Sequence, residues 1–149
     1  MKTRVVLLLT AALFLAADDA KEEAIKKDRA RLKGSWNVVS LERDGSKPAT
    51  DDQLKTVTTT IDADGKMTVE ANGSTVVEAT TRIDPTTDPK SIDFTFTEGE
   101  MKGESAKGIY EVKDATFRYC RAAPGKERPK EFSAKGGSGN TLIVFKRSK

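Results

Sequence analysis

The sequence predicts a mainly β protein, a single antiparallel barrel of about eight short strands with a short N-terminal helix. Apolar residues recur at every second position in short stretches from Gly34 to the C-terminus. Tight-turn dipeptides such as Asp44-Gly45 and Asn72-Gly73 separate these stretches. A chain of 149 residues has room for one hydrophobic core. We therefore expect one barrel domain at residues 34–149, preceded by a helical segment at 18–33.

The first seventeen residues have the pattern of an export signal. Lys2 and Arg4 form a basic start, an apolar run follows at 5–15, and two small alanines end at Ala17. As a helix, the apolar run would rise only ~16 Å, which is about half the hydrocarbon core of a bilayer. We therefore expect a signal peptide at 1–17, cleavage near Ala17, and no stable membrane span. The mature protein would be periplasmic or extracellular.

Composition excludes several functions. The chain has 26 basic and 23 acidic residues, and it is nearly neutral once the two basic residues of the signal are removed. A nearly neutral chain has no global electrostatic footprint for nucleic acid. The sequence has no histidine and one cysteine, so it lacks a Ser-His-Asp triad, a histidine metal site and an intrachain disulfide. We expect no cofactor, no metal and no catalytic residues.

A helix is expected at 20–33, where two Glu/Lys pairs are spaced i,i+4 and Gly34 ends the helix. Its apolar stripe is thin, so two interpretations remain open. The helix is either a solvated element resting on the domain or a lid over one barrel end. A single helical turn is also expected at 50–55, with Thr50 as its N-cap.

Alternation and turn signals place the strands. We expect them at 36–41, 57–61, 66–70, 75–83, 91–97, 107–112, 115–121 and 141–147. The last strand should pair antiparallel with 34–43, because an open sheet would leave two apolar edges unpaired. The inward-facing side chains could fill the core or line a pocket for one ligand. The pocket candidates are Trp36, Val38, Phe94, Phe96, Tyr110, Phe117 and Tyr119.

The segment Gly34-Ser35-Trp36-Asn37-Val38-Val39-Ser40 resembles the Gly-x-Trp opening strand of lipocalin-like barrels. The chain more specifically resembles a planctomycete family of exported proteins of unknown function. The matching segments are 34–45, 92–96, 108–111, 124–129 and 142–144. The resemblance implies a lipocalin-like fold and export, and it carries over no catalytic residues. It also implies that Trp36 closes one barrel end beneath a basic residue of a late strand, here Arg147 or Lys146.

Three further features have two interpretations each. The loop at 123–132 carries Lys126 and Arg128, and it is either a rigid polar loop or a docking loop beside the barrel mouth. The segment 62–66 superficially resembles a calcium loop, but it lacks enough oxygen donors and fits a hairpin turn better. Cys120 is either a buried small hydrophobe or a reactive thiol, and the inert interpretation is favoured because no partner cysteine exists.

Together these features predict an exported, non-enzymatic lipocalin-like module that binds a small apolar or amphipathic ligand in the barrel. The alternative is an envelope protein-interaction or structural module with a solid core, in which the 122–140 loop contacts a protein partner. The sequence does not identify the ligand or that partner.

Overall fold

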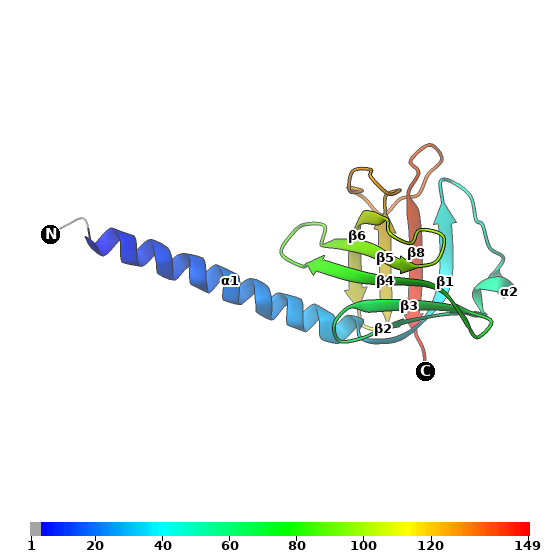
Figure 1. Ribbon diagram of the computed structural model, residues 1–149, viewed down its shortest axis with the longest axis horizontal. Coiled ribbons are helices and arrows are strands. Elements are labelled where there is room, and N and C mark those ends of the chain that lie inside the picture. The colour runs from blue at the N-terminus through cyan, green and yellow to red at the C-terminus, as the bar shows by residue number, and fades with distance from the viewer. Residues whose placement is uncertain (1–3) are drawn as a thin grey trace.

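The protein folds as one long helix followed by a closed barrel of eight strands. The structure is a computed structural model that describes residues 4–149, and the side chains of its first helix from Phe14 onward. The elements are α1 (Arg4–Leu32), β1 (Gly34–Arg43), α2 (Asp51–Leu54), β2 (Val57–Ile61), β3 (Lys66–Ala71), β4 (Ser74–Asp84), β5 (Ser91–Glu98), β6 (Ser105–Lys113), β7 (Thr116–Arg121) and β8 (Thr141–Arg147). The strands follow chain order around the barrel (Figure 1). The predicted fold class is confirmed.

The barrel closes where its first and last strands meet. β1 pairs antiparallel with β8, from Trp36 opposite Arg147 to Arg43 opposite Thr141, with a bulge between Val38 and Ser40. Every other neighbouring pair is also antiparallel. The predicted closure is therefore confirmed, and no strand of the barrel has an unpaired edge.

The local signals of the sequence explain the short elements. Thr50 caps α2, and Gln53 bonds back to the Thr50 backbone, which completes a capping box. Asn72 has a φ of 52° and Gly73 a φ of 79°, as a tight hairpin between β3 and β4 requires. The expected turn at 62–66 is confirmed, since the Asp62 carboxylate accepts from the backbone N–H groups of Asp64 and Lys66 at 2.9 Å.

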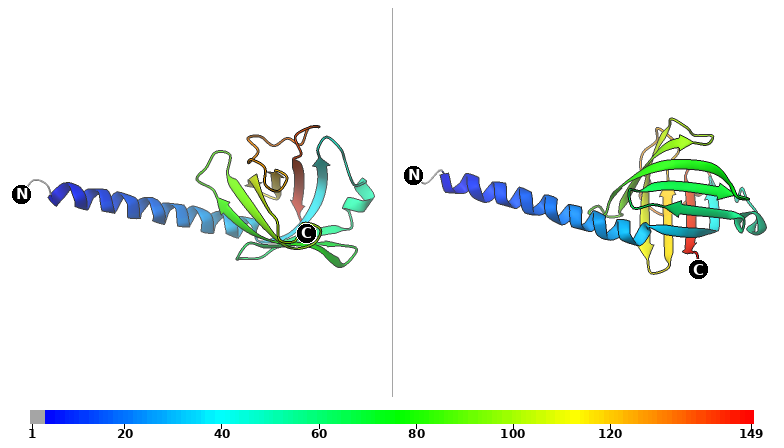
Figure 2. Two further views of the ribbon diagram at one scale, coloured as in Figure 1. Left: turned by 45° about the horizontal axis from the view of Figure 1, so that its top comes forward. Right: turned by 60° about the horizontal axis from the view of Figure 1, so that its bottom comes forward.

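Helix α1 is longer than the sequence predicts. We expected it at 20–33, whereas it begins at Arg4 and ends at Leu32. No glycine or proline occurs within it, so nothing interrupts the helix between the apolar run and the charged stretch. Figures 1 and 2 show its N-terminal part leaving the barrel as an arm, and the side chains at 14–20 are exposed. Lys2 of the expected signal peptide lies outside the described residues.

The last turns of α1 cover one end of the barrel. Leu32 is 1% exposed and Asp28 is 3% exposed, and both lie against the strands. This arrangement corresponds to the lid interpretation rather than to a helix resting on the surface. We call the covered end the closed end and the opposite end the open end. No helix in the described part of the chain is long and apolar enough to span a membrane.

Candidate functional site

Trp36 and Arg147 fix the closed end. The indole N–H of Trp36 donates to the Leu32 carbonyl at 2.8 Å, and the Arg147 guanidinium lies 4.2 Å from the centre of the indole ring. Arg147 also donates to the Lys33 carbonyl at 2.9 Å and to the carbonyl of Arg31. It therefore covers the Trp36 ring and caps orphan carbonyls at the C-terminus of α1. The predicted contact between Arg147 and Trp36 is confirmed.

The glycine of the Gly-x-Trp segment is required by this packing. Gly34 has a φ of 126°, in a region that other residues rarely adopt. A Cβ atom at this position would lie 2.8 Å from Nη1 of Arg147. Gly34 therefore allows the chain to turn from α1 into β1 while Arg147 reaches over Trp36.

A buried carboxylate joins α1 to the barrel at the closed end. Asp28 accepts hydrogen bonds from the Tyr110 hydroxyl and the Lys90 ammonium group, both at 2.7 Å. Burial raises the pKa of Tyr110 above its usual range, and the hydrogen bond to Asp28 raises it further. All three groups are satisfied by one another, so this cluster is structural rather than a free binding site.

Arg29 makes a second connection between α1 and the barrel. Its guanidinium donates to the Thr81 hydroxyl at 2.8 Å and also to the Thr81 carbonyl. Burial lowers the pKa of Arg29, and Gly65 leaves the space that the guanidinium occupies. Sequence reasoning missed both Asp28 and Arg29, because their partners are between 52 and 82 residues away along the chain.

The seven predicted pocket residues all lie in the hydrophobic core. Each is at most 8% exposed, and five of them contact one another through their rings. Trp36 and Phe117 have ring centres 5.5 Å apart, and Phe94 and Tyr119 have ring centres 4.8 Å apart. These side chains form a continuous core that runs from Trp36 at the closed end to Phe96, beside Arg121, toward the open end. The seven residues are Trp36, Val38, Phe94, Phe96, Tyr110, Phe117 and Tyr119.

The open end differs because its apolar side chains are only half-buried. They face inward from the ends of several strands and from two loops, and they pack on the outer layer of the core. Leu54 of α2 is 7% exposed and lies among the core residues at the same end. The half-buried set is Leu41, Ala49, Val57, Val69, Val77, Met101 and Ile143.

Two arginines lie in one row at the open end. Arg43 of β1 and Arg121 of β7 are both opposite Thr141 of β8, so all three side chains point to the same side of the sheet, the inside of the barrel. Arg121 is 7% exposed, and its guanidinium lies 5.4 Å from the Phe96 ring centre. Among the described carboxylates, none forms an ion pair with either arginine.

Tyr119 connects this row to the aromatic core. It precedes Arg121 by two positions on β7 and therefore points to the same side. Burial raises the pKa of the Tyr119 hydroxyl, while the positive charge of Arg121, its hydrogen bond to this hydroxyl and the positive charge of Arg43 oppose that rise. Sequence reasoning placed Tyr119 inside the barrel but missed Arg121, although the alternation Phe117, Tyr119, Arg121 carries the signal.

The 122–140 loop packs as a strap on the outer wall of the barrel. Arg128 donates to Asp93 at 2.7 Å and to the Gly108 carbonyl at 2.6 Å. The Cys120 thiol donates to the Ser133 carbonyl at 3.3 Å and is buried. Burial raises the pKa of Cys120, which agrees with the inert interpretation. Arg128 holds the strap in place, so its side chain is engaged within the protein.

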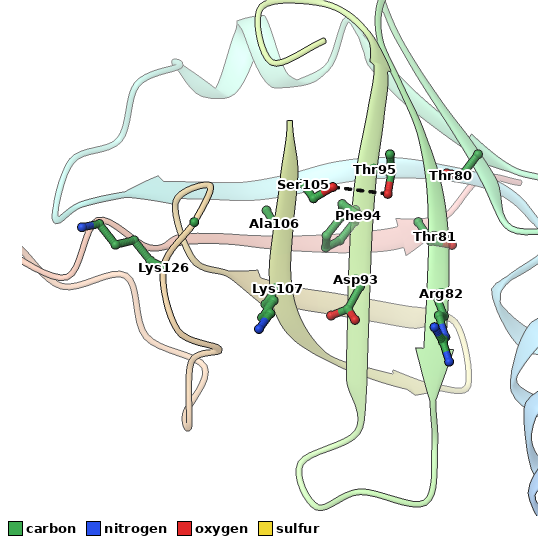
Figure 3. A pocket seen from close by; sticks show the side chains of 11 residues that line it. Thr80, Thr81, Arg82, Asp93, Phe94, Thr95, Ser105, Ala106, Lys107 and Lys126 are labelled. Carbon is green, nitrogen blue, oxygen red and sulfur yellow. Dashed lines mark hydrogen bonds between the residues drawn. The ribbon is translucent and has the colours of Figure 1, made fainter. Parts of the chain in front are cut away.

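Lys126 lies beside a hollow of about 480 Å³ on the outer wall. Figure 3 shows its side chain reaching from the strap, while Arg82 and Lys107 project from β4 and β6. These three cations form no ion pair with a described carboxylate. Asp93, which also lines the hollow, is paired with Arg128 at 2.7 Å. The hollow is therefore basic and open to solvent. Lys126 and Arg128 therefore both lie at the outer wall, Lys126 at the hollow and Arg128 on Asp93 beside it.

Among the side chains that the structure describes, no group of three acidic, cysteine or histidine residues is arranged to hold a metal ion. The chain matches no protein-family model, and no curated protein or solved structure is significantly similar to it.

Proposed function

We propose that the protein is an exported, non-enzymatic lipocalin-like module that binds a small amphipathic molecule at the open end of its barrel, and that it is related to the planctomycete family its sequence resembles. The half-buried apolar side chains at the open end carry this proposal. They face the interior, yet water reaches them, so a ligand that covers them gains free energy from the apolar area it removes from water.

Because the closed end is filled, a ligand would enter the barrel from the open end. Trp36, Arg147 and the last turns of α1 fill the closed end, and the aromatic core lies directly beyond it. A ligand would therefore lie across the open half rather than run through the barrel. Leu54 lies in the core at the open end and is carried by a helix of four residues. A shift of α2 would let an apolar tail reach the core.

Export is compatible with the fold. The side chains at 14–20 are exposed, whereas the helix residues that contact the barrel follow Ala17: Lys21 binds Asp84, and Asp28 and Leu32 are buried. Cleavage near Ala17 would leave the closed end intact. Mass spectrometry of the protein isolated from its native cells tests this point, with a mature N-terminus near Asp18 expected. A full-length chain in the cytoplasmic fraction would contradict it.

Calorimetric titration with dodecanol tests the binding function. The neighbouring residues Val76 and Val77 provide a matched pair, because Val76 is 44% exposed while Val77 packs on the core at the open end. We expect saturable binding of dodecanol that Val77→Ser weakens several-fold and Val76→Ser leaves unchanged. No saturable binding, or equal effects of the two substitutions, would contradict the proposal.

A second candidate is an envelope interaction module that uses the outer wall. The basic hollow beside Lys126 favours it, because three cations that pair with no described carboxylate surround one depression and suit an acidic protein partner. Lys126→Glu would then abolish capture of a partner from envelope extract without lowering the free energy of unfolding. Arg128 is unsuitable for this test, since its replacement would also remove the strap contacts to Asp93 and Gly108.

A further inference from the structure

Arg121 is a buried cation at the open end, and the described residues supply no counter-charge for it. It is 7% exposed. A buried charge without a counter-charge costs several kcal/mol, so such groups are normally paired. The Phe96 ring at 5.4 Å and the neutral Tyr119 hydroxyl, which is hydrogen-bonded to Arg121, offset only part of this cost. An anion that enters from solvent would supply the missing charge.

The neighbours of Arg121 suit an oxyanion. Arg43 lies in the same row, two strands away across β8, so its backbone is about 10 Å from that of Arg121. Long side chains from the two positions can converge on one group between them. The Tyr119 hydroxyl is hydrogen-bonded to Arg121, and its own O–H can donate to an anion at the same place. Guanidinium groups bind carboxylates through two parallel hydrogen bonds.

Two of the half-buried apolar side chains at the open end lie next to the row of Arg43, Thr141 and Arg121. Leu41 precedes Arg43 by two positions on β1, and Ile143 follows Thr141 by two positions on β8. Both are half-buried and pack on the core. A ligand whose charged group lies at the arginines would therefore place its tail against these side chains.

We propose that the open end binds a carboxylate amphiphile, with the carboxylate between Arg121 and Arg43 and the apolar tail against Leu41, Ile143 and the rest of the half-buried set. The head-group site presupposes the binding function proposed above and assigns its ligand class. Recognition of the carboxylate can therefore be tested separately from binding of the apolar tail.

Three probes separate these contributions: dodecanoate, dodecanol and acetate. We expect dodecanoate to bind at least tenfold more tightly than dodecanol in calorimetric titrations, and acetate to bind far more weakly than either. Arg121→Gln should reduce the affinity for dodecanoate tenfold or more and change that for dodecanol less than twofold. The control Arg82→Gln removes the same charge from the outer wall, where Arg82 is exposed, and should leave both affinities within twofold.

Arg43→Gln provides a second variant at an exposed position, so a folding defect of Arg121→Gln would not end the test. We expect Arg43→Gln to weaken dodecanoate several-fold and leave dodecanol unchanged. If dodecanol and dodecanoate bind equally and both arginine variants have no effect, the carboxylate site is wrong while the binding function stands. If neither probe binds, both proposals fail. Loss of affinity in Arg82→Gln to the same extent would place the anion on the outer wall and overturn the assignment.

Discussion

Asp28 is expected to stabilise the closed end of the barrel strongly, and its replacement by alanine tests the role of α1. The substitution removes the acceptor of the Tyr110 hydroxyl and the counter-charge of Lys90, both at 2.7 Å. Breaking a buried ion pair by removing one partner costs about 3–5 kcal/mol. Lys90 is 36% exposed, so water compensates part of its loss, whereas Tyr110 is 1% exposed and its hydroxyl stays unsatisfied at a cost of about 1–3 kcal/mol. We expect Asp28→Ala to lower the free energy of unfolding by about 3 kcal/mol.

Urea denaturation followed by tryptophan fluorescence measures this effect directly. Trp36 is the single tryptophan of the chain and lies beside Leu32 at the closed end, so its emission reports on the contact between α1 and the barrel. Glu23→Ala is the matched control on the same helix, because Glu23 is 75% exposed and, of the side chains that the structure describes, pairs only with Lys26 at 3.4 Å. Its effect should stay within about 0.5 kcal/mol.

A double-mutant cycle separates the hydrogen bond from the charge. Tyr110→Phe removes only the hydroxyl that donates a hydrogen bond to Asp28. The two substitutions should show a coupling energy of about 1 kcal/mol or more, since the effects of substitutions within one hydrogen-bond network on the free energy of unfolding are not additive. If Asp28→Ala costs no more than Glu23→Ala, or if the cycle shows no coupling, α1 does not close the barrel in the way described.

Four other perturbations follow from named contacts. A chain that ends at Asn140 lacks β8 and should lose cooperative unfolding altogether, so a soluble, cooperatively folding product would contradict closure by β1 and β8. Arg147→Met keeps the bulk over the indole but loses two hydrogen bonds to the end of α1, and we expect about 1–2 kcal/mol of destabilisation in the same urea assay. Cys120 is buried and its pKa is raised, so alkylation by iodoacetamide at pH 8 should be far slower than for the unfolded chain, and an equal rate would refute its burial. The bond from Lys21 holds the pKa of Asp84 at about 2, below its usual 3.8. The Asp84 carboxylate therefore contributes its full stabilisation above pH 4 and loses it as the pH falls to 2. An NMR titration of this carboxylate with a midpoint near 3.8 would contradict the contact with Lys21.

Most of the barrel could be predicted because its signals are local. Alternation marks each strand, and turn residues such as Asn72 and Gly73 mark the hairpins, so the strand positions agree with the structure to within a few residues. Closure could also be predicted, since pairing β1 with β8 removes the two apolar edges. The contact between Arg147 and Trp36 came from the resemblance to lipocalin-like barrels, and the structure confirms it.

The parts that could not be predicted depend on distant partners. Asp28 looks like an ordinary charged residue of a solvated helix, and only the fold brings Tyr110, 82 positions later, to its carboxylate. Arg128 has the composition of an exposed docking residue, yet its hydrogen bonds go to the outer wall. In both cases the residue type correctly indicated that the side chain would make a charged contact. It did not indicate which group would be the partner.

The two ends of the barrel differ in how a buried charge is compensated. This difference distinguishes a structural cluster at the closed end from the proposed binding site at the open end. At the closed end, Asp28 lies with Lys90 and Tyr110 within 2.7 Å, so the cluster is complete without any ligand. At the open end, Arg121 is almost as buried but has no carboxylate partner among the described residues. The cost of burying this charge must be offset either by the Phe96 ring, the Tyr119 hydroxyl and water, or by an anion. Arg121→Met distinguishes these cases, because in ligand-free protein it should raise the free energy of unfolding if the charge is uncompensated. A loss of stability would show that the guanidinium is a structural element of the open end rather than a site left free for a ligand.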